Sequence, residues 1–321
     1  MMPDRLGVLS STRYVIDHAR HVHLAVDRLR AVCSDIARTG VSLPQWNREL
    51  HWSDGEEETA MYIFVLDSLN FCFWGEPRWT ITYKQQTLDG YWALAASLRR
   101  AVEEGVPILD ASYLAEMPER DLAHVLRGTT TIPLFAERLA HLHELGRWLV
   151  SAYNGQCGEV VRSACGDAVA LVQRVVSELS SFNDIAHYDD HVVRLYKRAQ
   201  ILVGDLAGSL DHKGLGAFTN LHELTAFADY KLPQILRRFG ILVYEPNVAA
   251  MVDTRQLLAA GSEEEVEIRA HTVWAVELMR RELEKQGLTY MAYQLDWWLW
   301  EASQKLPGDA RPYHRTRTIY Y

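Results

Sequence analysis

Helical periodicity in residues 91–305 is the feature that most constrains how this 321-residue chain can fold. Apolar residues recur there at the three- and four-residue spacing of an amphipathic helix face, almost without interruption. The pattern predicts helices over 91–104, 119–127, 133–153, 158–181, 189–208, 231–239, 262–286 and 288–305. Pro133 and a capping box of Ser262 with Glu265 are typical of helix starts. The sequence therefore predicts a mainly α fold.

The first ninety residues are less uniform. Residues 10–38 have helical spacing and are followed by Gly40, which predicts one long helix. Ser53 with Glu56 fits a capping box for the next helix.

One stretch of the chain has β character. The apolar run 61–74 fits either a buried helix or a strand, whereas 80–91 predicts a strand that ends in an Asp89-Gly90 turn. We therefore expect a small β element near residues 62–84. Because no repeat, low-complexity tract or linker divides the chain, we expect one domain over 1–321.

Composition excludes several classes of protein. The formal net charge of −9 argues against a protein that binds duplex nucleic acid through its backbone, since such proteins carry excess cations. No run approaches the ~20 apolar residues of a membrane span. The cysteines form no CxxC motif, which favours a reducing compartment, and we expect a cytoplasmic protein. They are Cys33, Cys72, Cys157 and Cys165.

The stretch from Tyr290 to Tyr321 is rich in aromatic residues around one carboxylate. On a helix, Asp296 shares a face with Tyr293, Leu299 and Trp300. A carboxylate in such surroundings has a raised pKa or faces a developing positive charge. The alternative is a structural acid that accepts hydrogen bonds from an indole or from backbone donors.

Cations and tyrosines alternate at the end of this stretch. The guanidinium groups of Arg311, Arg315 and Arg317 suit a phosphate, and Tyr320 and Tyr321 lie next to them in the sequence. The alternative is a frayed, solvated tail, against which the two closing tyrosines argue.

Two further stretches combine acids with other polar groups. In HYDDHVVRLYKR (187–198), two aspartates between two histidines suggest a metal, but adjacent helical residues point apart. Helix capping by an aspartate is favoured there, and we expect no metal site. In LTAFADYKLPQILRRFG (224–240), Asp229 is either an N-cap or a catalytic group, and LPQILRRFGIL looks like half of a helix-hairpin-helix.

Four segments taken together resemble the queuosine salvage protein family, which comprises queuosine 5'-phosphate N-glycosylases/hydrolases. They are NFCFW (70–74), FADYKLPQ (227–234), the helix around Asp296 and HRTRTIYY (314–321). The resemblance implies a compact, mainly helical domain similar to helix-hairpin-helix DNA glycosylases. It also implies hydrolysis of queuosine 5'-monophosphate with release of queuine for tRNA modification, without a metal or organic cofactor.

Under this resemblance, hydrolysis of an N-glycosidic bond needs a carboxylate that faces the cationic ribose. Asp296 is the first candidate and Asp229, against the edge of the base, is the second, although their roles could be exchanged. The remaining candidates would bind substrate. Stacking faces come from Phe71, Trp74, Phe227 and Trp297, polar contacts from His51, Asn70, Tyr230 and Lys231, and phosphate contacts from Lys197, Arg315, Arg317 and Tyr320.

Two other functions remain open. A non-catalytic protein could use the same pocket to bind a modified nucleotide or tRNA. A glycosylase for damaged DNA is disfavoured by the acidic charge balance. The sequence does not determine the oligomeric state, the choice among nucleoside, monophosphate and tRNA, or the presence of a covalent intermediate.

Overall fold

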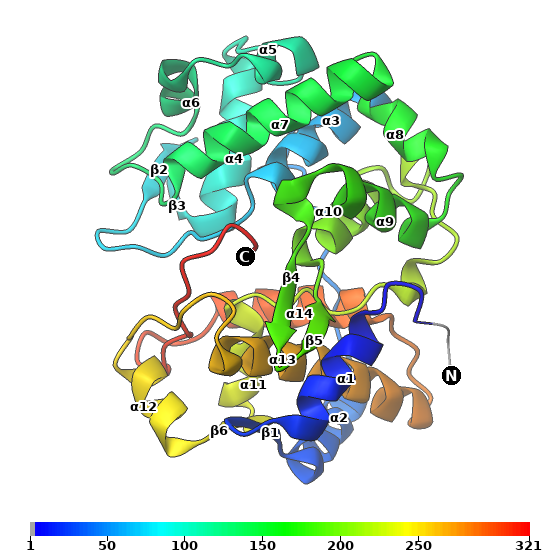
Figure 1. Ribbon diagram of the computed structural model, residues 1–321, viewed down its shortest axis with the longest axis vertical. Helices are drawn as coiled ribbons and strands as arrows, with labels where there is room; N and C mark the ends of the chain where they lie inside the picture. Colours follow the sequence, from blue (N-terminus) through cyan, green and yellow to red (C-terminus); the bar gives the residue numbers. More distant parts are fainter. Residues whose placement is uncertain (1–3) are drawn as a thin grey trace.

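The computed structural model describes residues 4–321. The molecule has two halves, each made mainly of helices (Figure 1). The upper half in Figure 1 contains α3 (Glu56–Ser68), α4 (Gly90–Glu103), α5 (Ala111–Ala115), α6 (Glu119–Val125), α7 (Phe135–Tyr153), α8 (Cys157–Ser163), α9 (Ala168–Glu178) and α10 (Lys197–Ser209). The lower half contains α1 (Val8–His18), α2 (Val26–Thr39), α11 (Lys231–Arg238), α12 (Pro246–Asp253), α13 (Glu263–Lys285) and α14 (Ala292–Gln304). The predicted mainly α fold is confirmed.

Strands occur as three antiparallel pairs. They are β1 (Val22–Leu24) with β6 (Leu242–Tyr244), β2 (Thr80–Tyr83) with β3 (Gln86–Asp89), and β4 (Ile185–Tyr188) with β5 (His191–Arg194). Short 3₁₀ turns are η1 (Ser180–Phe182), η2 (Gly214–Gly216) and η3 (Leu221–Glu223). Each pair is local except β1–β6, whose strands lie more than two hundred residues apart in the sequence.

The apolar core has two large parts. One surrounds α3, whose residues 59–68 are all buried, and the other lies among α2, α11, α13 and α14. A helix buried on every side has no amphipathic pattern, which is why the periodicity of 61–74 could not separate helix from strand. The β element expected near 62–84 is therefore partly wrong: 62–68 is helical, and the hairpin occupies 80–89.

The long helix expected over 10–38 is wrong. The chain instead forms α1, then β1, then α2, and Val22 pairs with Tyr244 of β6. The Glu267 carboxylate accepts hydrogen bonds from the backbone N–H groups of Arg20, His21 and Val22, at 2.7–2.9 Å. These partners are more than two hundred residues away, so local spacing could not reveal the break.

Two other predicted helices are also divided. Residues 189–194 belong to the β4–β5 hairpin, in which Asp189 has a φ of 48° and lies in the turn, so neither Asp189 nor Asp190 caps α10. Cys165 and Gly166, with φ of 52° and 74°, separate α8 from α9. Each break contains a residue with a positive φ, a backbone conformation that a right-handed helix does not accommodate.

The predicted helix starts have mixed outcomes. Ser53 caps nothing, because α3 begins after Gly55. Ser262 does accept a hydrogen bond from the Glu265 backbone N–H (3.4 Å), but the Glu265 side chain accepts from Gly261. After α11 the chain enters β6 rather than a second helix, and the likeness to helix-hairpin-helix glycosylases is not confirmed.

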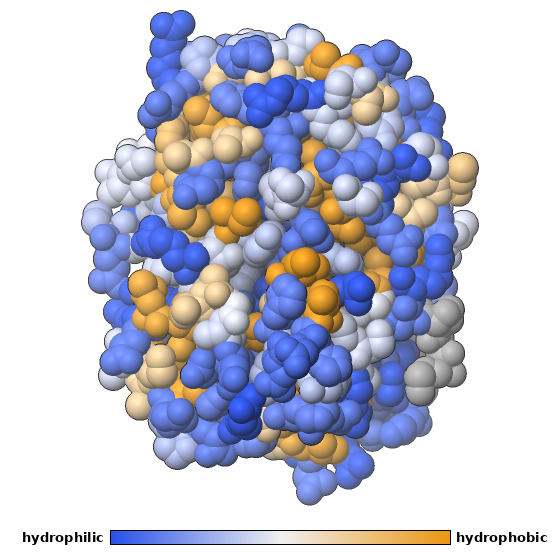
Figure 2. Space-filling view, viewed as in Figure 1, coloured by the Kyte–Doolittle hydropathy of each residue, from blue (hydrophilic) through white to orange (hydrophobic). Residues whose placement is uncertain are grey.

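The face shown in Figure 2 interleaves hydrophilic and hydrophobic residues. Exposed large apolar side chains include Val26, Val150, Val192, Val243 and Leu257. Within residues 4–321, every helix is too short or too polar to cross a membrane.

Candidate active site

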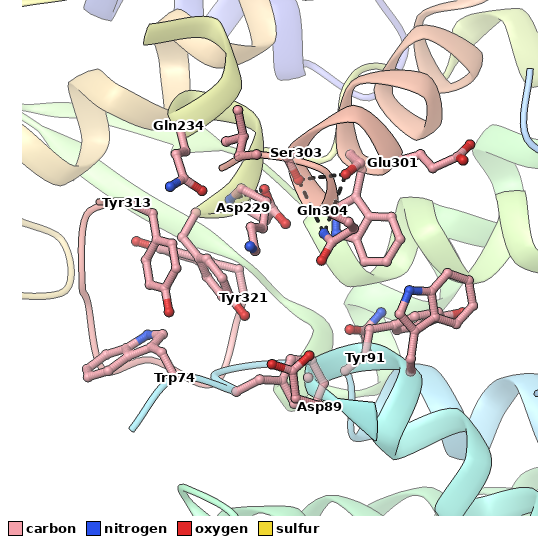
Figure 3. A pocket seen from close by; sticks show the side chains of 18 of the residues that line it. Trp74, Asp89, Tyr91, Asp229, Gln234, Glu301, Ser303, Gln304, Tyr313 and Tyr321 are labelled. Atoms are coloured by element: carbon pink, nitrogen blue, oxygen red, sulfur yellow. Dashed lines mark hydrogen bonds between the residues drawn. The ribbon is translucent and has the colours of Figure 1, made fainter. Parts of the chain in front are cut away.

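A cavity of about 1210 Å³ lies where the two halves of the molecule meet. Its walls come from the loop after α3, the start of α4, one face of α10, the loop before α11, α14 and the segment 310–321. Figure 3 shows Asp229 in the middle of this pocket, with Trp74 and Tyr313 on one side and Tyr91 on the other. The pocket thus combines acids with aromatic walls.

Asp296 projects from α14 into this pocket and is only 3% exposed. Its Oδ2 accepts one hydrogen bond, from the backbone N–H of Phe227 at 3.0 Å. Burial raises its pKa well above 3.8, and the neighbouring charge of Asp229 raises it further. The Phe227 N–H and the charge of Lys197 lower this pKa, but they do not cancel the increase. Asp296 therefore holds its proton more tightly than an ordinary aspartate.

Asp229 lies just before α11 and caps it. Its Oδ1 accepts from the backbone N–H groups of Lys231 and Leu232, both at 2.8 Å. Burial raises its pKa, while the Lys197 ammonium and the two N–H groups lower it. The capping alternative raised from the sequence is therefore confirmed for one oxygen of Asp229; the carboxylate also lines the pocket, and its catalytic role stays a prediction.

Lys197 is the first residue of α10 and is 5% exposed. Its Nζ donates to the carbonyl of Asn70 at 3.4 Å. Burial lowers its pKa, and the charges of Asp229 and Asp67 act against that decrease. The lysine is therefore the cation that faces the buried acids, rather than a surface charge.

Tryptophans and tyrosines form the walls. On one side, Trp297 packs on α10 where Gly208 leaves room, since a Cβ there would lie 3.2 Å from the indole. Trp46 stacks on His51 with ring centroids 4.1 Å apart. On the other side, a buried aromatic group with Cys72 comprises Phe71, Trp74, Tyr230 and Tyr321. Such flat apolar faces suit a heterocyclic ligand.

Two buried arginines hold the loop that carries Phe71. Arg138 donates to the carbonyls of Leu69, Phe71 and Cys72, and its guanidinium lies 4.3 Å from the Phe71 ring centroid. Arg198 lies 5.0 Å from the same centroid. The aromatic ring is thus fixed before any ligand arrives.

Most of the site residues predicted from the sequence line the pocket. Twelve do so: His51, Asn70, Phe71, Trp74, Lys197, Phe227, Asp229, Tyr230, Lys231, Asp296, Trp297 and Arg315. Arg317 and Tyr320 are not among its lining residues. Arg317 is exposed, and its guanidinium lies over the Trp74 ring, 5.4 Å from the ring centroid. The final tyrosine, Tyr321, is buried, so the segment is not a frayed tail.

Sequence reasoning missed Asp205, Tyr91 and Trp300, which also line the pocket. Asp205 could have been found, because it lies eight residues after Lys197 on an otherwise apolar helix face. Trp300 had the signal of sharing a helix face with Asp296, but Tyr91 carries none, since aromatic residues at helical spacing are usually core.

A mainly helical fold around a pocket of acids and aromatic rings defines a protein that binds a small heterocyclic ligand. The family model described as queuosine salvage protein matches residues 50–321, and the chain belongs to this family. A Sphaerobacter thermophilus protein named queuosine 5'-phosphate N-glycosylase/hydrolase is 52% identical, covering 99% of this chain and 98% of the relative. Proteins of the same name from Mus musculus and Dictyostelium discoideum are 33% and 34% identical, each covering 98% of this chain and 99% and 98% of the relative.

Proposed function

We propose that this protein hydrolyses the N-glycosidic bond of queuosine 5'-monophosphate and releases queuine for salvage into tRNA modification. The names of its relatives support the substrate. The observation that carries the chemistry is the pairing of Asp229 and Asp296 with Lys197 inside one aromatic pocket. The four free cysteines fit a reducing, cytoplasmic setting.

The two acids have different protonation states in this mechanism. Asp229 has two N–H donors and a facing lysine, so it is the ionised member of the pair. Asp296 has one N–H donor and a negative neighbour, so it is protonated. An ionised Asp229 stabilises the oxocarbenium-like ribose and accepts the proton of the attacking water, which Asp296 helps to orient. This assignment gives Asp229 the position facing the ribose that was first given to Asp296.

Substrate binding is divided along the pocket. The base stacks between the aromatic walls, and the 5'-phosphate binds Arg315 and Lys231. Arg315 already pairs with Glu76 through a 2.8 Å contact, and Lys231 lies 5.4 Å from the Tyr313 ring centroid. Binding the remote phosphate fixes the ribose over Asp229, which supports the chemical step. Arg317 and Tyr320 have no part in this arrangement.

The test is incubation of the protein with queuosine 5'-monophosphate and, in parallel, with queuosine, with free queuine measured by chromatography. We expect release from the monophosphate, a loss of ~10²-fold or more in kcat for Asp229→Asn, and a smaller loss for Asp296→Asn. No release by the wild type, with retained affinity in both variants, would instead support a non-catalytic nucleotide binder.

A further inference from the structure

A line of polar contacts runs from the loop before α3 to the pocket side of α10. His51 Nδ1 lies 2.7 Å from the carbonyl oxygen of Asn47, and His51 Nε2 lies 2.8 Å from Tyr91 Oη. Tyr91 Oη in turn lies 3.4 Å from Asp205 Oδ2. Figure 3 shows Tyr91 at the edge of the cavity that His51 and Asp205 also line. The mechanism above uses none of these groups.

The number of protons available fixes the direction of each bond. A carbonyl can only accept, so His51 carries its proton on Nδ1, and Nε2 of a neutral ring is an acceptor. The Tyr91 hydroxyl has one proton, and it donates this proton to His51 Nε2, the nearer of its two partners. A hydrogen bond between Tyr91 and Asp205 then requires that Asp205 supply the proton. The chain of contacts therefore selects the carboxylic acid form of Asp205.

A protonated His51 would donate from Nε2 to Tyr91 and so reverse the directions of these hydrogen bonds. The surroundings of the ring, however, oppose a positive charge. The ring is 2% exposed, and Arg99 Nη1 donates to the His51 carbonyl at 2.8 Å, which places another cation beside it. Burial first, and Arg99 to a smaller extent, lower the His51 pKa to about 4. The ring is neutral at physiological pH.

The charges around Asp205 also favour its protonated form. Asp205 is 4% exposed. Burial raises its pKa well above 3.8 and the charge of Asp67 raises it further, while Lys197 acts in the opposite direction, as would a Tyr91 hydroxyl that donated its proton to Asp205 instead of His51. Lys197 also faces Asp229 and Asp67, and a single positive charge cannot stabilise the ionised form of every acid around it.

The position of Asp205 suits contact with the edge of a stacked base. Lys197, Ile201 and Asp205 line the pocket from one face of α10, at four-residue intervals. Trp297 packs on the same helix at Gly204 and Gly208. A heterocycle that stacks on an indole offers its polar edge to side chains beyond the ring, and Asp205 is a pocket-lining acid next to Gly204 in the sequence.

We propose that Asp205 is a further catalytic residue, a neutral carboxylic acid that protonates the departing base, with Tyr91 and His51 as positioning residues that keep its proton in place. This inference rests on the proposed hydrolysis. As the C–N bond breaks, its electron pair moves to the base, and the Asp205 proton goes to an acceptor on the base edge. Water adds to the ribose carbon and loses a proton to Asp229. Solvent returns that proton to Asp205 before the next turnover.

The experiment compares wild type with Asp205→Asn and Tyr91→Phe. Asp205→Asn keeps the shape and an N–H donor but has no transferable proton, so we expect kcat to fall ~10²–10⁴-fold, with KM changed only a few-fold. Tyr91→Phe removes the acceptor that stabilises the protonated acid, so the fall of kcat at high pH should move to lower pH. Thermal unfolding of both variants shows whether they fold.

A second readout does not depend on turnover. The infrared carbonyl absorption of protonated carboxylic acids should be weaker in Asp205→Asn than in wild type at neutral pH by the contribution of one group, since Asp296 keeps its own band. An unchanged absorption, or a variant with wild-type kcat, would overturn the role of Asp205 while leaving the hydrolase intact. Absence of queuine release by the wild type would reject the hydrolase itself, whatever the infrared spectrum shows.

Discussion

Asp229 and Asp296 lie in the same pocket, yet their hydrogen-bond partners differ. Two N–H donors and Lys197 favour the anion of Asp229, whereas Asp296 has one N–H donor and the charge of Asp229 nearby. Paired titratable groups with such different surroundings divide acid and base roles between them. At the residue scale, the environment rather than the residue type determines what each acid does.

These surroundings predict a bell-shaped pH profile for kcat/KM. Asp229 must be ionised and has a raised pKa, so activity should fall on the acid side at a pH above 3.8. Asp296 must be protonated and Lys197 cationic, so activity should fall on the alkaline side as either loses its proton. Queuine release measured across the pH range checks this. An acid limb at or below 3.8 would contradict the assignment of Asp229.

Asp67 predicts a pH-dependent stability. Its Oδ1 accepts from Asn70 at 3.2 Å, while its Oδ2 has no partner within residues 4–321. Burial raises its pKa from 3.8 to about 7, partly opposed by Asn70, Lys197 and Arg198. Because the folded state binds this proton more tightly than the unfolded chain, the free energy of unfolding should decrease as pH rises from about 4 to about 7.

Asp67→Asn removes this titration. We expect the variant to be more stable than wild type above about pH 7, by at most ~4 kcal/mol, and to gain little near pH 4. Urea unfolding at several pH values measures the difference. A stability gain that does not change with pH would show that Asp67 does not carry the effect.

At the scale of elements, small residues allow helices to approach closely. A Cβ at Gly146 of α7 would lie 2.2 Å from the Ala115 backbone nitrogen and 2.6 Å from the Ala111 carbonyl oxygen of α5. Neither backbone atom can move without displacing its helix. The contact between α5 and α7 therefore requires glycine at this position.

Gly146→Ala should destabilise the protein by about 1–3 kcal/mol, although alanine has the higher helix propensity. Gly204→Ala is the matched control, because a Cβ there would lie 3.4 Å from a Trp297 side-chain atom and meet no backbone. Thermal unfolding of the two variants compares the same substitution in two helices. Equal melting temperatures would show that α5 and α7 separate without cost.

At the scale of the whole molecule, one buried ion pair connects the two halves at the site. Arg269 of α13 binds both oxygens of Asp184, at 2.9 and 2.6 Å, and its Nε donates to the carbonyl of Ala228 at 3.1 Å. Asp184 Oδ2 also accepts from the Lys197 backbone N–H at 3.1 Å. The same pair thus fixes the chain beside both Asp229 and Lys197.

Arg269→Lys keeps the charge but cannot make the three hydrogen bonds, so we expect kcat to fall at least tenfold with a moderate loss of stability. Arg269→Met leaves Asp184 without its cation and should cost about 3–5 kcal/mol. Queuine release and urea unfolding measure the two effects. Full activity in Arg269→Lys would mean that the pair is structural and does not position the site.

The sequence by itself determined what depends on local pattern: the mainly α class, most helices after residue 91, and several of the acids and aromatic residues that line the pocket. Local spacing carries this information because helix faces and caps are set by residues within a few positions. It could not show the break at β1, where the partners Tyr244 and Glu267 lie far along the chain.

Tertiary structure alone decided the electrostatics of the site. Lys197 is a buried counter-charge and Arg317 lies outside the pocket because of how α10 and the last segment pack, which no local pattern encodes. The same holds for Asp205, whose partners His51 and Tyr91 come from separate segments. A pKa depends on burial and on neighbours in space, and both exist only after the chain has folded.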